Sequence, residues 1–306
     1  MKRLSLIFSI LIIGCQGCAV TKRQIPPVAT IEGIADRFER GQIVDLRLGK
    51  AVSFEELIDD IASVGLVFVG EAHDNPEHHL IQTQILQALW ARRGRLAVAI
   101  EYLPGSAQGA IDRYLDGEST EQEFLTQSAW EETWGYDYHL YRPLILSARL
   151  NGGKVIALNA PREVVRKVAR QGLEGLSAEE RAELPPDIDL NDKAHRAYLR
   201  EVYQQHAHGR LKHFEYFYQA QCVWEDTMAH HLAAHMVANS GPVVAFSGNG
   251  HIVNKFGIPN RTIKRFPTSM VTIMPYSLNK SIDIKKETAD YVWLSSDCSR
   301  RPGRTK

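Results

Sequence analysis

Residues 66–76, with the sequence LVFVGEAHDNP, constrain the fold more than any other part of the chain. The four apolar residues predict a buried strand, and the glycine after them ends it. Asn75 and Pro76 suit the N-cap and the first position of a helix. Glu71 and His73 therefore follow the carboxyl end of a strand, where open parallel sheets bind ligands. Residues two apart in an extended chain point the same way, so this carboxylate and imidazole can face one object.

Short apolar runs alternate with helical patterns along the rest of the chain. A helix is expected over 76–92 because its apolar residues recur on one face. Strands are predicted at 66–69, 96–100, 154–158, 243–246, 270–274 and 291–294. This alternation predicts an α/β fold with a mainly parallel sheet flanked by helices. Two helical insertions, around 104–150 and 163–235, are expected to pack together as a smaller helical subdomain over the strand ends.

The N-terminus has the pattern of an export signal. A basic start and a short apolar run predict a signal peptide over residues 1–14. The junction at Cys15 is similar to a bacterial lipobox, which predicts lipidation of Cys15 and a lipidated tether over 15–40. The glutamine after this cysteine favours the outer membrane by lipoprotein sorting rules. The alternatives are an uncleaved anchor helix and cleavage before Cys18, which fits the motif poorly.

The remaining chain has the composition of a globular domain, expected over 41–295 and followed by a basic tail over 296–306. The full sequence has 36 basic and 36 acidic residues, so the basic excess that nucleic-acid binding requires is missing. Three cysteines remain after cleavage at Cys15, too few for a disulfide framework. No spacing argument supports a bridge between Cys222 and Cys298.

Polar residues follow four of the predicted strands. They are Glu71 with His73, Glu101, Asn159 with Arg162, and Asn249 with His251. Each one alone is more commonly a solvated loop residue or an N-cap. Buried carboxylates cost free energy unless they are paired, so four such sites at one edge of a sheet indicate a polar crevice. Gly248 and Gly250 allow a close approach of the backbone to a ligand.

This crevice also has the chemistry of a metal site. A divalent ion accepts nitrogen and oxygen ligands, here Glu71, His73, Glu101 and His251. Such an ion would polarise a carbonyl or activate water, with one glutamate as general base. The sequence has no Gly-x-Ser-x-Gly elbow for a serine nucleophile. His231 and His235 have metal-binding spacing, but surface histidines are the favoured interpretation because no glutamate follows His231.

Several short motifs, taken in order, resemble the ChaN-type haem-binding lipoprotein family. The resemblance runs from about residue 45 to about residue 276, with one departure, Glu225 where the family usually has aspartate. The motifs are VGEAHD at 69–74, AVAIE at 97–101, IALNAPR at 156–162, AQCVWEDTMA at 220–229, GNGH at 248–251 and GIP at 257–259.

The resemblance implies an outer-membrane haem-binding protein of bacterial iron uptake, with an outer-membrane haem receptor as a partner. In that family haem lies at a homodimer interface, with a tyrosine on the iron and histidine and lysine near the propionates. The wider superfamily includes Tiki-type metalloproteases and erythromycin esterases, which share the Gly-Glu-x-His pattern. A metal-dependent hydrolase is therefore the alternative function, and a structural scaffold ranks last because it leaves the strand-end residues unexplained.

Two aromatic patches offer the tyrosine that the resemblance implies. The first, residues 206–218, supplies Tyr216 or Tyr218 for iron and Lys212, His213 or His206 for propionates. An aromatic helix face packed in the core is an equally good interpretation. The second patch contains Tyr136, Tyr138, His139 and Tyr141, of which Tyr141 is the next candidate. An exposed apolar patch large enough for a porphyrin favours pairing about a two-fold axis, so haem binding and dimerisation are expected to be linked.

Overall fold

A computed structural model describes residues 26–206 and 213–298 and contains one large sheet. Its order is β4-β3-β11-β9-β5-β8-β6-β7, and every neighbouring pair from β11 to β7 is parallel. The short β3 and β4 add an antiparallel edge. The strands are β3 (Ile43–Asp45), β4 (Lys50–Val52), β5 (Leu66–Val69), β6 (Ala97–Pro104), β7 (Lys154–Asn159), β8 (Val243–Phe246), β9 (Met270–Ser277) and β11 (Tyr291–Ser295). The α/β prediction is confirmed, and all six predicted strands are present.

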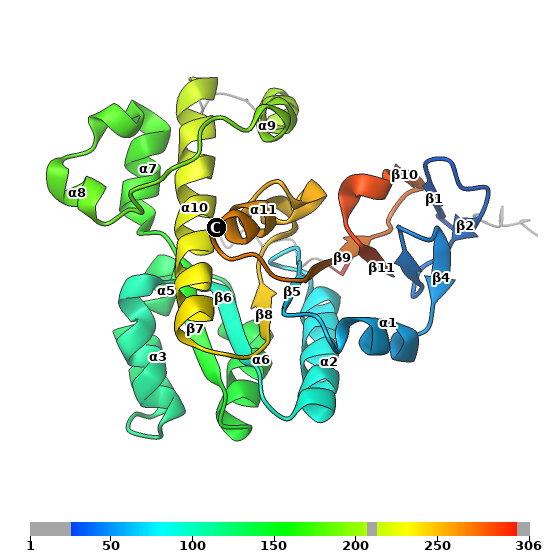
Figure 1. Ribbon diagram of the computed structural model, residues 1–306, viewed down its shortest axis with the longest axis horizontal. Helices are drawn as coiled ribbons and strands as arrows, with labels where there is room; N and C mark the ends of the chain where they lie inside the picture. The colour runs from blue at the N-terminus through cyan, green and yellow to red at the C-terminus, as the bar shows by residue number, and fades with distance from the viewer. Residues whose placement is uncertain (1–25, 207–212, 299–306) are drawn as a thin grey trace, which may run out of the picture.

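Helices cover both faces of this sheet (Figure 1). Side chains alternate along β5, so Val67 and Val69 join one hydrophobic cluster while Leu66 and Phe68 join the other. The first cluster is built with α1 (Phe54–Ile61), α2 (Pro76–Arg93), α3 (Gln108–Leu115), α4 (Glu121–Gln127), α5 (Trp130–Thr133) and α6 (Tyr138–Leu150). The second is built with α10 (Phe214–Ala238) and α11 (Ile258–Arg265). A strand buried on both faces needs the continuous apolar run that the sequence has.

The two helical insertions bury their apolar side chains in different hydrophobic clusters. The first, α3 to α6, packs in the same cluster as α1 and α2. The second forms its own small clusters, in which α7 (Arg162–Gln171) and α9 (Lys193–His206) pack against the first half of α10, while α8 (Ala178–Ala182) lies on the far side of α7 (Figure 1).

The segment expected to be a tether carries structure from Ala29 onward. β1 (Ala29–Ile31) pairs with β2 (Arg37–Phe38) and with β10 (Ile282–Ile284) in a separate three-stranded sheet. Cys15, Cys18 and the rest of residues 1–25 lie outside the described residues, as do residues 299–306. Within the described ranges, no helix has the length and apolar character needed to cross a membrane. Cys222 is buried and Cys298 is exposed, and both are free thiols.

Candidate functional site

The site lies at the carboxyl ends of three neighbouring strands, β5, β8 and β6. The register aligns Val69 with Phe246 and Phe246 with Ile100, so the residues that follow these three positions leave the sheet at one level. Glu101 continues β6 directly, whereas β5 and β8 each break at a glycine-containing turn. The polar crevice that the sequence indicated therefore exists at this edge of the sheet.

Glu71 is the centre of a buried hydrogen-bond cluster. Its carboxylate accepts hydrogen bonds from Tyr102 at 2.7 Å, from Gln82 at 2.9 Å and from Tyr141 at 3.2 Å. His73 Nδ1 lies 2.7 Å from Oε1 of the same carboxylate. Burial raises the pKa of Glu71, but the hydrogen bond with His73 and the neighbouring imidazoles outweigh it, and the pKa lies below its ordinary value. Glu71 is thus an ionised group that orients His73.

Helix α2 positions this cluster. Asn75 caps the helix by accepting from the Glu77 N–H at 3.0 Å, and Pro76 follows as the first helical residue. The amide of Asn75 also donates to Ser277 Oγ and to the Ser296 carbonyl, both at 2.9 Å. The turn that carries Glu71 and His73 is therefore fixed to the ends of two further strands.

A second buried pair comes from β6 and the turn after β8. The Gly248 N–H donates to Glu101 Oε2 at 2.7 Å, and His251 Nε2 lies 3.5 Å from Glu101 Oε1. On its other side His251 Nδ1 lies 3.3 Å from Glu225, a residue of α10. Burial lowers the pKa of His251, but the charges and hydrogen bonds of Glu101 and Glu225 raise it to about 10. His251 is therefore a buried imidazolium at neutral pH.

Gly248 brings the two pairs together. A Cβ at this position would lie 2.8 Å from Cε1 and 3.1 Å from Nε2 of the His73 ring. Because Gly248 has no side chain, the His73 ring lies directly against the Gly248 backbone, whose N–H donates to Glu101. Gly70 has a similar role, because a Cβ there would overlap the Asn249 side chain.

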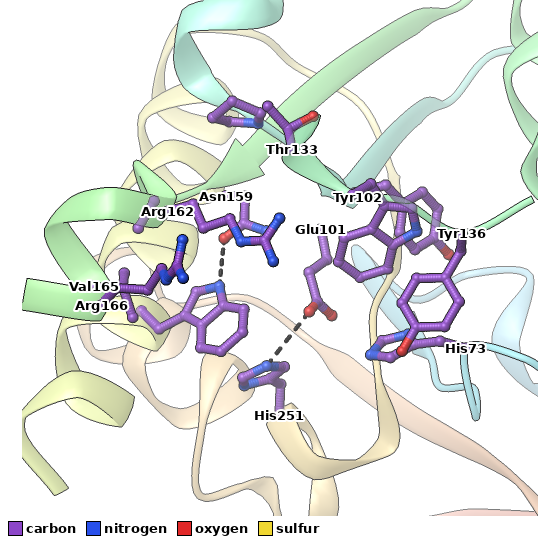
Figure 2. A pocket seen from close by; sticks show the side chains of 14 residues that line it. His73, Glu101, Tyr102, Thr133, Tyr136, Asn159, Arg162, Val165, Arg166 and His251 are labelled. Carbon is purple, nitrogen blue, oxygen red and sulfur yellow. Dashed lines mark hydrogen bonds and ion pairs between the residues drawn. The ribbon is translucent and has the colours of Figure 1, made fainter. Parts of the chain in front are cut away.

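These groups face a cavity of about 280 Å³ (Figure 2). His73, Glu101 and His251 line it, and Glu71 lies behind His73. The two helical insertions supply the opposite walls and meet where Arg162 Nη1 donates to the Glu132 carbonyl at 2.6 Å. The remaining lining residues are Tyr102, Pro104, Thr133, Trp134, Tyr136, Asn159, Ala160, Val165, Arg166 and Trp224.

Basic side chains outnumber acidic ones in the lining of this cavity. Arg162 and Arg166 lie on α7, and His251 is cationic. Burial lowers the pKa of His73, but the hydrogen bond with Glu71 and the charge of Glu101 outweigh it, so this pKa lies above its ordinary value. Glu101 is the one acidic residue in the lining, and it is already paired with His251. Because Glu71, Glu101 and Glu225 balance the two histidines, Arg162 and Arg166 are the groups of the lining that suit an anionic ligand.

The metal-ligand set expected from the sequence is divided between the two pairs. Across residues 26–206 and 213–298, no three His, Cys, Asp or Glu side chains are arranged to hold one metal ion. His231 and His235, which have metal-binding spacing, do not form a joint site, because His231 Nδ1 lies 2.9 Å from the Leu158 carbonyl while His235 Nδ1 is near Asn239.

The expected iron ligands fall in different environments. Tyr218 and Tyr141 are each 0% exposed, and their hydroxyls donate to Leu190 and Glu71 respectively. Burial raises the pKa of both phenols well above the ordinary value, which disfavours a phenolate. Tyr216 is half-buried beside Gly172, about 12 Å along α10 from Trp224 of the cavity. His213 is exposed, Lys212 lies outside the described residues, and so does the side chain of His206.

Two aromatic residues of the site carried little sequence signal. Tyr136 is 38% exposed, and its ring centroid is 5.2 Å from that of His73. Trp134 meets the same imidazole edge-on at 4.8 Å. Tyr136 belonged to the second aromatic patch, whereas Trp134 lay in an insertion without a strand end nearby. Glu225 and Trp224 stood in a recognised motif, but the motif alone did not place them against His251.

The site is thus a cavity lined by aromatic and basic side chains at the strand ends of an α/β sheet. Comparison with known families identifies the class of protein to which it belongs. The family described as "Haem-binding uptake, Tiki superfamily, ChaN" matches residues 57–262. The chain therefore belongs to the ChaN-type haem-binding family of the Tiki superfamily.

A solved structure of a ChaN protein agrees with this assignment at the level of the fold, and further similar proteins are known. The structure of ChaN of Campylobacter jejuni, described as showing cofacial haem binding, has a TM-score of 0.64 and 19% identity, covering 82% of this chain and 95% of that one. An erythromycin esterase in its open conformation has a TM-score of 0.46 and 14% identity, covering 77% and 76% of the two chains. The chloroplastic protein RETICULATA-RELATED 5 of Arabidopsis thaliana is 23% identical over 88% of this chain. This chain spans 39% of that plant protein's length.

Proposed function

We propose that this protein binds haem over the mouth of the cavity at the strand ends and serves haem or iron uptake. The observation that carries the proposal is the cavity lining, which combines aromatic rings, two arginines and a partly exposed tyrosine, Tyr136. Small-molecule sites usually enclose about 300–1,000 Å³. A porphyrin is a large flat ring, and a cavity of about 280 Å³ cannot enclose it. The ring would instead lie across the opening.

Tyr136 is the iron ligand that the side-chain positions favour. Its neighbours Trp134 and His73 offer ring surfaces to a porphyrin. Burial and the charges of Asp74, Glu71 and Glu101 raise the pKa of Tyr136, but a ferric ion reverses this effect by favouring an anionic ligand. Tyr216 is the second candidate, because it is the other partly accessible tyrosine among those predicted from the sequence.

Arg162 and Arg166 suit the two propionates. Each has one contact already, Arg162 with the Glu132 carbonyl and Arg166 with Glu163 at 2.9 Å, and the planar guanidinium retains further N–H donors. Arginine binds carboxylates with two parallel hydrogen bonds when the geometry allows. In this proposal the propionates bind to arginines of α7, in place of the sequence-based candidates Lys212, His213 and His206.

Pairing of two copies follows from an open haem site. A porphyrin lying across a cavity mouth leaves its outer face exposed, and a second copy would cover it. Cofacial haem binding in the Campylobacter jejuni protein supports this arrangement. We further propose that Cys15 carries the lipid anchor and that the protein is tethered to the outer membrane, where a haem receptor would be its partner.

A titration with haemin and with haemin dimethyl ester tests the haem proposal. A saturable Soret band is expected with both. Arg162→Ala with Arg166→Ala should weaken haemin binding by about tenfold or more, but leave the ester, which lacks carboxylates, nearly unchanged. Equal losses for both ligands would remove the propionate assignment, and no saturable band would remove the haem assignment.

One observation favours a second function, hydrolysis. His73 is oriented by Glu71 at 2.7 Å and lines a cavity, which is the arrangement of a general base and its orienting group. The raised pKa of His73 favours anion binding instead, because a base must be neutral at the working pH. Turnover of p-nitrophenyl acetate, with and without added Zn²⁺, that is lost in His73→Gln would support the hydrolase.

A further inference from the structure

A second cavity, of about 550 Å³, lies at the opposite edge of the sheet from the haem-family cavity, the one that His73, Glu101 and His251 line. It is found where α2, α6 and α10 end and where β6, β7 and β8 begin (Figure 1). Its basic lining residues are Arg93, Arg95, Lys154 and His235, and no aspartate or glutamate of the described residues lines it. A cavity with this composition suits an anionic ligand.

Part of this positive charge already has a structural role. The carbonyl ends of three helices attract cations, and Arg93 Nη2 donates to the Val64 carbonyl at 2.7 Å. Arg95 and Lys154 are exposed on the loop before β6 and at the start of β7, and Lys154 is paired in register with Ala97. Arg95 stands two residues before Ala97, the partner of Lys154, so these two cations line the same cavity at the start of adjacent strands.

Acidic residues border the basic cavity without lining it. The adjoining cavity shares Lys154 and His235 with the first and adds Asp112 and Asp116, together with Arg149. Beside Arg93, Glu55 and Asp59 form ion pairs with Arg92.

Two exposed apolar side chains adjoin the basic cavity. Leu150 is 76% exposed and Val237 is 72% exposed, and each is the direct neighbour of a lining residue, Asn151 and Ala238 respectively. Both lie in the last turn of a helix that ends at this edge. Exposed leucine and valine beside cations are typical of surfaces that lie on a membrane, where apolar side chains enter the interface and cations bind headgroups.

We propose that this edge docks on an anionic phospholipid surface. The phosphate of a headgroup binds between Arg95 and Lys154, while Leu150 and Val237 enter the outer part of the acyl-chain region. Charge complementarity selects the occupant, because each lysine or arginine near an anionic membrane strengthens binding by about fivefold. In this orientation the haem-family cavity, at the other edge of the sheet, faces away from the bilayer.

Amide hydrogen exchange on the full chain tests the proposal locally, so a lipid anchor elsewhere does not dominate the readout. The protein is measured with phosphatidylcholine vesicles and with mixed phosphatidylcholine–phosphatidylglycerol vesicles. Peptides covering residues 149–154 and 236–241 should exchange at least about fivefold more slowly with the anionic vesicles. Arg95→Glu with Lys154→Glu should abolish this protection, and Leu150→Ser with Val237→Ser should reduce it.

The matched control reverses two exposed charges elsewhere, Lys280→Glu with Lys286→Glu, and should leave the protection intact. Equal loss in this control would show a general charge effect and overturn the site. Protection by inorganic phosphate without vesicles, at the same strength, would assign a soluble phosphate ligand and overturn the membrane assignment. Equal exchange with both kinds of vesicle would overturn the proposal outright.

Discussion

Glu225 is the residue that connects the site to the helical half of the molecule. It is fully buried, and its carboxylate lies 3.3 Å from His251, 3.4 Å from His195 and 3.5 Å from Arg261. Arg261 also forms an ion pair with Asp226. The charge of Glu225 is therefore shared between the cavity histidine and a buried arginine.

Glu225→Gln should lower the pKa of His251 from about 10 toward its ordinary value, because a neutral amide no longer stabilises the imidazolium. The free energy of unfolding should fall by about 1–3 kcal/mol through the disturbed pairing with Arg261. NMR titration of the His251 ring measures the first effect. An unchanged His251 pKa would mean that Glu101 alone holds the charge.

Protonation of His78 makes the free energy of unfolding depend on pH in the acidic range. Its Nδ1 accepts from the Ala72 N–H at 2.8 Å, its Nε2 lies 2.8 Å from Ser295 Oγ, and burial lowers its pKa to about 4. A depressed histidine pKa means that the unfolded chain binds the proton first. Stability from this group is therefore complete above about pH 6.5 and is lost as the pH falls toward 4.

The free energy of unfolding should fall by up to about 3 kcal/mol over this window, in addition to the effects of other groups. His78→Asn keeps an acceptor for Ala72 but cannot titrate, so its stability curve should be flatter between pH 6.5 and 4. Urea unfolding at several pH values provides the comparison. Parallel curves for the two proteins would contradict the assignment.

Residues of the site differ in how far the sequence could predict them. Glu71, His73, Glu101 and His251 follow strands that were recognisable as apolar runs, and the parallel order of β5, β8 and β6 brings them to one edge. The tyrosines were chosen by local density, which does not report which face of a helix is buried. Tyr218 packs with Leu199 and Cys222, so the aromatic run that contains it has a core face. Tyr136 reaches the site through a tertiary contact with His73, which no local pattern in the sequence reports.

At the scale of elements, the start of α2 is the junction on which the site depends most. Asn75 is fully buried, caps the helix and binds the ends of β9 and β11 through Ser277 and Ser296. Ser53 caps α1 in an exposed capping box without such tertiary bonds. The two caps therefore allow a matched comparison.

Asn75→Ala should lower the free energy of unfolding by about 2–4 kcal/mol, because buried partners lose their hydrogen bonds together with the cap. Ser53→Ala should cost about 1 kcal/mol, the usual value for a cap alone. Chemical denaturation measures both. Equal costs for the two variants would mean that the tertiary bonds of Asn75 contribute little.

The sequence predicted long elements better than short ones. The six core strands are continuous apolar runs, whereas β1 to β4 have two or three residues each and leave no periodic pattern. The sequence did not predict which partner each insertion packs against, because amphipathicity shows that a face is buried but not against which partner. The separate clusters of the two insertions followed only from the structure.

At the scale of the whole molecule, the haem-family cavity opens between the two insertions, so a bound porphyrin would contact both. A second copy covering the outer face of the porphyrin makes haem binding and association one equilibrium. Sedimentation velocity of the protein at a fixed low concentration should show monomer without haemin and dimer with it. Haem-saturated protein that sediments as a monomer would contradict this linkage.

The identity of the iron ligand tests the central claim most directly, through the absorption spectra of the haemin complexes of Tyr136→Phe and Tyr216→Phe. Each variant removes one hydroxyl from a tyrosine that is not fully buried. Tyr136→Phe should shift the Soret band and remove the phenolate-to-iron charge-transfer band, while circular dichroism shows an intact fold and Tyr216→Phe keeps the parent spectrum. A parent spectrum in Tyr136→Phe, with the loss appearing in Tyr216→Phe, would place haem on the helical insertion and contradict the site at the strand ends.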